Sequence, residues 1–254
     1  MASFSYAFIL STLAGLSTLI GFVPLLFNLK NEKTIIMASL AFASGVMICV
    51  SITDLIPESF NLLTSIFKGF PALLFLLIFI SLGVIISMLI DKFLPKSENK
   101  NVSDKKLYRL GLVSMLAIIM HNIPEGVATF LSSSTNKSLG LSLAFAISFH
   151  NIPEGISIAI PIYFSTKSKF KAFIYTLISG LSEPLGAILA YFFLASIINN
   201  FIMSIILSII SGIMIHISIY ELLNESLSYK RRNFTFVFFG VGFIFMLISH
   251  FLLG

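Results

Sequence analysis

The sequence is dominated by eight long stretches of mostly apolar residues with short polar segments between them. A helix needs about 20 such residues to cross the hydrocarbon core of a bilayer. Soluble domains carry roughly a quarter charged residues, whereas this chain is 57% hydrophobic and only 11% charged, so its surface requires a lipid bilayer. The sequence therefore predicts an all-α membrane protein of eight transmembrane helices, forming one polytopic domain over residues 1–254. The expected spans are about 4–29, 34–57, 71–94, 108–131, 138–163, 172–195, 199–222 and 233–253.

No further domain or disulfide framework is expected. The first span has no Lys or Arg before Lys30 and no small-residue cleavage site, which indicates a retained helix rather than a signal peptide. The longest polar stretch, residues 95–106, is typical of a flexible loop. The single cysteine, Cys49, excludes a disulfide framework and a thiolate metal cluster, and we expect it to be a small buried side chain.

The distribution of basic residues predicts the orientation of the chain. Of the sixteen Lys and Arg residues, all but Lys68 and Lys137 lie in or beside the loops after the first, third, fifth and seventh spans. Because cytoplasmic loops carry the excess of Lys and Arg, both termini are expected on the outer side of the cell membrane. The charges are spread over four loops, which argues against nucleic acid as a partner despite the net charge of +5.

Three pairs of segments repeat within the chain. The motif His-Asn-Ile-Pro-Glu-Gly occurs at 121–126 in the fourth span and at 150–155 in the fifth. Residues 44–59 align without gaps to residues 211–226, and a shorter Gly-Leu-Ser-x-x-x-Gly pattern links 15–21 to 180–186. Paired spans cross in opposite directions, so we expect a 3+2+3 arrangement, with spans 1–3 and 6–8 forming an inverted repeat around spans 4 and 5. Inverted repeats with a site near the midplane are typical of secondary transporters.

Four acidic residues within the apolar spans need a separate explanation from the acids of the loops: Asp54, Glu125, Glu154 and Glu183. An ionised carboxylate at the centre of a transmembrane helix costs roughly 2.5–3.5 kcal/mol. Because no Lys or Arg lies in the middle of a span, an ion pair with either cannot offset this cost. A divalent cation can, and the sequence therefore predicts a metal site within the membrane.

The repeated motif places candidate ligands on one face of each helix. His121 and Glu125 are four residues apart, and Asn122 and Glu125 are three apart, so these side chains are neighbours. Pro124 removes a backbone donor and crowds the carbonyl of Met120, so the fourth span is expected to kink or open there. Imidazole and carboxylate ligands together suit zinc and its first-row neighbours. The fifth span repeats the pattern with His150, Asn151, Pro153, Glu154 and the carbonyl of Phe149.

The remaining polar residues of the spans allow more than one interpretation. His216 and His250 are lone histidines, which favours helix packing through a hydrogen bond. Glu183 precedes Pro184 in the sixth span, and this neighbour favours a place in the metal site. The matching acids of the second and seventh spans are placed to attract cations to the two mouths of a pathway, and for Glu58 and Glu225 the alternative is an ordinary solvated charge at a helix end. These acids are Asp54, Glu58, Glu221 and Glu225.

On these motifs, the sequence resembles the ZIP (Zrt- and Irt-like) family of metal transporters, and most closely its bacterial ZupT-type members, over essentially the whole chain. The resemblance rests on HNIPEG in spans four and five, followed by Ser182-Glu183-Pro184 in span six. It implies import of divalent metal into the cytoplasm, zinc above all, with iron, manganese, cobalt and cadmium as further substrates. It also implies a homodimer in which spans 1, 4, 5 and 6 slide as a block against spans 2, 3, 7 and 8.

The resemblance further implies a binuclear site between spans four, five and six. One metal would be held by His121, Glu125, His150 and Glu154. The other would be held by Asn122, Asn151, Glu125, Glu154 and Glu183, with the glutamates bridging. Some relatives have Asp at the position of Asn151, so the second site is less negative here and is expected to bind more weakly. The loop at 95–106 lacks the histidine-rich tract of many relatives, which argues against metal sensing by that loop.

Two other functions are compatible with the residues alone. An intramembrane metallohydrolase would need a water-activating base and an open coordination position, and His-x-x-x-Glu twice differs from the His-Glu-x-x-His arrangement of such enzymes. A proton-coupled carrier of an organic solute would use the glutamates as proton relays. We expect a transporter that is not an enzyme, with the metal ion as its substrate and with no cofactor.

The charge distribution generates a prediction about topology. A cysteine introduced at Ser134 should react with a membrane-impermeant maleimide on intact cells, whereas a cysteine at Ser103 should react only after the cells are opened. The measurement is the extent of labelling of each variant before and after permeabilisation. Labelling of both positions from the same side would contradict the predicted number of spans.

Overall fold

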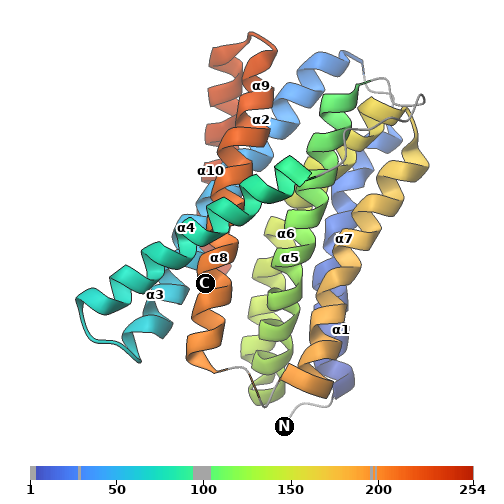
Figure 1. The fold of residues 1–254 in the computed structure, drawn as a ribbon. Helices are drawn as coiled ribbons and strands as arrows, with labels where there is room; N and C mark the ends of the chain where they lie inside the picture. The colour runs from blue at the N-terminus through green and yellow to red at the C-terminus, as the bar shows by residue number, and fades with distance from the viewer. Residues whose placement is uncertain (1–3, 28–29, 94–103, 195–196, 198, 254) are drawn as a thin grey trace.

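A computed structural model describes residues 4–27, 30–93, 104–194, 197 and 199–253 of the chain. Within these residues every regular element is a helix, and eight helical segments are long and apolar enough to cross a membrane. The chain is therefore an all-helical, multi-pass membrane protein. Most of the helices run side by side along the bundle, while α4 crosses them obliquely (Figure 1). The predicted flexible loop at 95–106 falls mainly on residues 94–103, which lie outside the described residues.

Several of the eight spans contain more than one helical segment. Their bounds are α1 Phe4–Ser17 with η1 Thr18–Leu26; α2 Glu32–Val50 with η2 Ser51–Leu55 and α3 Ile56–Thr64; α4 Phe70–Phe93; α5 Lys105–Thr135; α6 Lys137–Thr166; α7 Lys169–Leu189 with η3 Ala190–Leu194; α8 Asn200–His216 with η4 Ile217–Leu223 and α9 Asn224–Ser228; and α10 Arg232–Leu253. The second span continues beyond the predicted end at residue 57, because the chain stays helical from η2 into α3 with Pro57 at its start.

Polar side chains fix the beginnings of four helices. The side chain of Asp104 accepts a backbone hydrogen bond at the start of α5, and that of Asn199 does so at the start of α8. Asn136 and Ser168 do the same for α6 and α7. The first N–H groups of a helix have no partner within it, so these caps determine where the site-bearing helices begin.

The motif helices, which were expected to kink or open at their prolines, do not open there. α5 continues as an α-helix through Pro124, and α6 continues through Pro153. A proline removes one backbone hydrogen bond, and neighbouring helices in a membrane bundle keep the rest of the helix intact. The irregular turns lie instead in η1, a 3₁₀ segment that contains Pro24, and in the π-helical segments η2, η3 and η4. η2 and η4 occupy matching positions in the repeated segments 44–59 and 211–226.

Matching residues of these two repeated segments also make matching contacts. The hydroxyl of Ser59 donates to the carbonyl of Ser204, and the hydroxyl of Ser226 donates to the carbonyl of Met37, at 2.9 and 2.8 Å. Ser226 is the counterpart of Ser59 in the gapless alignment, and Ser204 falls opposite Met37 when that alignment is continued. The second and seventh spans are thus joined by the same hydrogen bond at each of their two ends.

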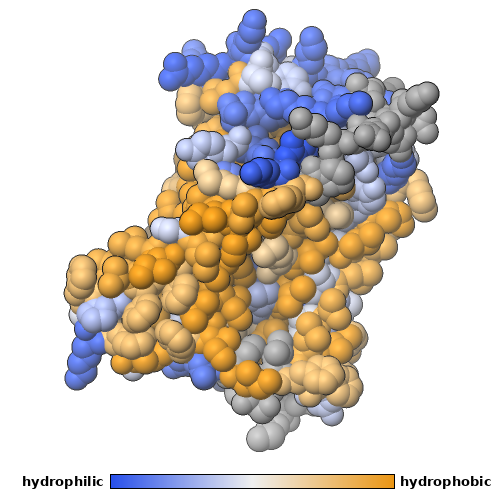
Figure 2. All heavy atoms as spheres, in the orientation of Figure 1, coloured by the Kyte–Doolittle hydropathy of each residue, from blue (hydrophilic) through white to orange (hydrophobic). Residues whose placement is uncertain are grey.

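The distribution of burial separates central from peripheral spans. In their most apolar windows, 67% of the second span and 61% of the fifth are buried, compared with 17% of α4 and 22% of α10. α4 and α10 therefore present most of their surface to lipid. Figure 2 shows a broad apolar surface along the bundle and hydrophilic side chains gathered at the end where α9 lies. The two motif helices α5 and α6 lie against each other within the bundle.

Candidate metal centre

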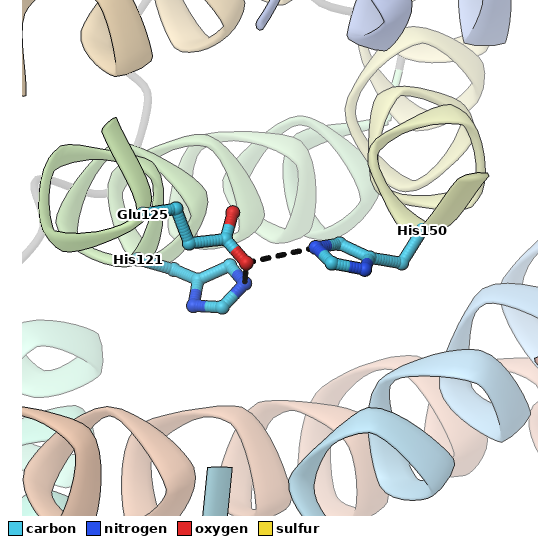
Figure 3. Close-up of side chains that lie close together, drawn as sticks. All are labelled: His121, Glu125 and His150. Carbon is cyan, nitrogen blue, oxygen red and sulfur yellow. Dashed lines mark hydrogen bonds and ion pairs between the residues drawn. The ribbon is translucent and has the colours of Figure 1, made fainter. Parts of the chain in front are cut away.

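Both copies of the repeated motif direct their histidine toward one carboxylate oxygen. The Nε2 atom of His121 lies 3.1 Å from Oε1 of Glu125, on the same face of α5. The Nε2 atom of His150, on α6, donates a hydrogen bond to that same oxygen at 2.8 Å. Figure 3 shows the two imidazole rings converging on Glu125 from the two helices. The four-residue spacing of the first motif thus brings His121 to Glu125 as the sequence predicts, whereas His150 of the second motif contacts the glutamate of the first.

These three side chains have the geometry of a metal-binding group. One ligand atom from each of His121, Glu125 and His150 can be chosen so that all three lie within 4.8 Å of one another. Two donors bound to one zinc ion at about 2.0–2.1 Å lie at most about 4.2 Å apart, so small side-chain movements suffice to bring the three donors around one ion. Two imidazoles with a carboxylate are donors that suit zinc.

Glu154, on α6, lies next to this group. Its side chain is only 1% exposed, and its Oε1 atom lies 3.6 Å from Nε2 of His121. From the sequence, a divalent cation was expected to offset the cost of the buried glutamates, because Lys and Arg are absent from the span centres. The structure shows that the two imidazoles also supply polar partners, which reduces the cost of burying Glu125.

The two motif asparagines connect the centre to α7 and α1. The Nδ2 atom of Asn151 donates to Oε2 of Glu183 at 2.9 Å and to the carbonyl of Ala14 at 3.0 Å. The Nδ2 atom of Asn122 donates to the carbonyl of Ser179 at 3.2 Å. With their nitrogens held in this way, both amides keep their oxygen atoms available as acceptors.

Unpartnered buried oxygen atoms accumulate at these residues. Each such atom costs about 1–3 kcal/mol when it is left without a hydrogen bond. Six carboxylate and amide oxygens of the predicted site are buried and have no hydrogen-bond partner within the described part of the chain. Acceptor atoms gathered in this way are suited to a cation. The six are Oδ1 of Asn122 and Asn151, Oε2 of Glu125, both oxygens of Glu154, and Oε1 of Glu183.

The lone histidines lie apart from this centre. His216 is hydrogen-bonded to Ser87 at 2.9 Å, between α8 and α4, which agrees with the packing role expected for it. The Nδ1 atom of His250 lies 2.6 Å from Oδ1 of Asp54, between α10 and η2, and both side chains are about one-third exposed. The sequence treated Asp54 and His250 separately, because nothing in the pattern of either span predicts this contact.

Ion pairs join the motif helices to the other spans at the end of the bundle where α5 begins. They connect Lys106 with Glu225, Arg109 with Asp91, and Lys167 with Glu32. A cavity of about 30 Å³ is lined there by Lys106, Glu221 and Glu225, among other residues. Sequence reasoning missed these pairs, because the partners of Lys106 and Lys167 are more than a hundred positions away and only the fold brings them together.

Comparison with known proteins gives one consistent result. A family model described as ZIP Zinc transporter matches residues 96–249. The chain is also similar to a protein named zinc transporter ZupT from Streptococcus mutans, with 41% identity covering 96% of each chain. A protein of the same name from Clostridium perfringens is 37% identical to this chain, and the match covers 96% of this chain and 94% of the relative. Another from Chlorobium luteolum is 38% identical, and the match covers 100% of both chains.

The geometry of the centre generates a prediction about its carboxylates. Glu125→Gln and Glu154→Gln should each weaken divalent-metal binding by at least about 10–100-fold, because each removes a negative charge and a donor atom from the group of ligands. The measurement is isothermal titration of purified protein with zinc. Glu58→Gln, which changes a glutamate outside the centre, is the matched control and should bind as the wild type does. Wild-type affinity in either centre variant would exclude that residue as a ligand.

Proposed function

Because the chain belongs to the ZIP zinc transporter family, we propose that it imports divalent metal ions across the cell membrane, with zinc as the main substrate. The observation that carries this proposal is the meeting of His121, Glu125 and His150 inside the bundle, with Glu154 beside them. The family consists of transporters, so the chain is not an enzyme. The metal is the transported substrate, and no cofactor is involved.

We further propose that the centre holds two metal ions. The first would be bound by His121, Glu125, His150 and Glu154. The second would be bound by the free amide oxygens of Asn122 and Asn151 together with Glu183, and Glu125 and Glu154 would bridge the two ions. The unpartnered oxygen atoms at these residues support this assignment. Iron, manganese, cobalt and cadmium share enough ligand preference with zinc to be carried more weakly.

The proposed transport cycle exposes this centre to the two membrane faces in turn. The matching contacts of the second and seventh spans support a single domain over residues 1–254 built as a 3+2+3 inverted repeat, the architecture that underlies alternating access in many carriers. With both termini outward, Asp54 would lie toward the outer mouth. Glu221 and Glu225 would lie toward the inner mouth, which the ion pair of Lys106 with Glu225 would help to close. The proposed transporter assembles as a homodimer.

Uptake by proteoliposomes that contain only the purified protein tests this function. We expect saturable accumulation of zinc, slower accumulation of the other four metals, and loss of uptake in Glu125→Gln. Protein-free liposomes are the control. Absence of metal uptake, combined with metal-independent uptake of an organic solute or with cleavage of a membrane peptide, would contradict the proposal and favour the proton-coupled carrier or the metallohydrolase.

A further inference from the structure

Each copy of the repeated motif ends in a glycine that lies directly against the backbone of a neighbouring helix. A methyl group added at Gly126 would overlap the carbonyl oxygen of Glu183 on α7. A methyl group added at Gly155 would overlap the carbonyl oxygen of Thr18 at the start of η1. Glu183 and Thr18 are matching positions in the repeated segments 180–186 and 15–21. The two motif helices thus make equivalent backbone contacts, but only the contact of Gly126 is made to a residue that carries a carboxylate.

The contact between α5 and α7 is close on both sides. Facing Gly126 from the other helix is Gly186, where an added methyl group would overlap the carbonyl oxygen of Ile123. A methyl group at either glycine meets backbone, which cannot rotate away as a side chain can, so α7 would have to move away from α5. Glycine is the residue that permits this separation of the two backbones.

The separation of α5 and α7 determines where the carboxylate of Glu183 lies. Glu183 is fully buried, and its Oε2 atom accepts the hydrogen bond from Asn151 of the second motif. Asn122, four residues before Gly126, donates to the carbonyl of Ser179 on α7. A displacement of α7 would therefore disturb both asparagine contacts and withdraw the third carboxylate from the centre.

We propose that Gly126, together with Gly186, is a positioning residue for metal binding: it sets the distance between α5 and α7 and so holds the Glu183 carboxylate at the centre. This inference rests on the proposed metal-transport function. According to this inference, the glycine of the motif influences metal affinity by positioning Glu183, although glycine has no side chain that could bind the metal.

The competing explanation is that these glycines serve helix packing alone, and a matched control separates the two. At Gly83 on α4, an added methyl group would overlap the carbonyl oxygen of Ile209 as severely as one at Gly126 overlaps that of Glu183. Gly83 lies on a peripheral span outside the motif helices. Gly83→Ala and Gly126→Ala therefore impose similar steric damage, but only the second acts beside a proposed ligand.

The experiment measures zinc affinity by calorimetry for the wild type, Gly83→Ala, Gly126→Ala, Glu183→Gln and the double variant Gly126→Ala/Glu183→Gln, each corrected for the amount of folded protein. We expect both alanine variants to lower abundance, but only Gly126→Ala to weaken binding, by about 10-fold or more. In the Glu183→Gln background, Gly126→Ala should add little, because residues that act through one group are not additive. Additive effects, equal losses in the two alanine variants, or wild-type affinity in Gly126→Ala would overturn the inference.

If the Gly126→Ala protein is not produced in folded form, a second variant tests the inference. Glu183→Asp shortens the side chain by one methylene group and leaves the glycine contact intact. It should therefore lower zinc affinity by a similar factor of about 10. Wild-type affinity in Glu183→Asp would then overturn the inference. Failure of the wild type itself to bind and transport zinc would instead count against the proposed function.

Discussion

The arrangement of the interior depends on the burial of three glutamates in a bundle whose span centres contain no Lys or Arg. Glu154 and Glu183 are almost completely buried, and Glu125 is nearly so. Two copies of one motif supply polar partners at this depth: two imidazoles for Glu125 and an amide for Glu183, while the oxygens of Glu154 have no hydrogen-bond partner among the described residues. The partners do not use the full acceptor capacity of these oxygens, which is the arrangement expected of a site that accepts and releases a cation.

Release requires that binding is not too rigid or too strong, and the chemistry of the centre provides for this. Neutral imidazoles and amides contribute donor atoms without adding negative charge, so the attraction for a divalent cation is limited to the carboxylates. The helices that carry the proposed ligands are continuous through their prolines and are packed backbone to backbone at glycines. The proposed ligands therefore lie on regular α-helical segments, while π-helical turns lie in the second and seventh spans and, beyond Glu183, at the end of the sixth.

The membrane spans and the contact between the histidine and glutamate of the first motif could be predicted from the sequence. Apolar length predicted eight membrane-crossing helices, and the four-residue spacing predicted the contact of His121 with Glu125, because both depend on regular helix geometry. At Pro124 the sequence predicted a kink or an opening, and of these two the opening does not occur, because packing keeps α5 helical there. Sequence reasoning also missed the contact of Asp54 with His250 and the ion pairs of Lys106 and Lys167, since no short-range pattern specifies which distant residues the fold brings together.

The central claim is that this group of residues binds metal as a two-ion centre, and the most direct test is the number of ions bound at saturation. Equilibrium dialysis of the purified protein against zinc, with metal counted by mass spectrometry, should give two ions per chain for the wild type. Glu183→Gln should retain one ion, held by the histidines with Glu125 and Glu154. A wild-type value of one or zero, or the same value in Glu183→Gln as in the wild type, would contradict the account.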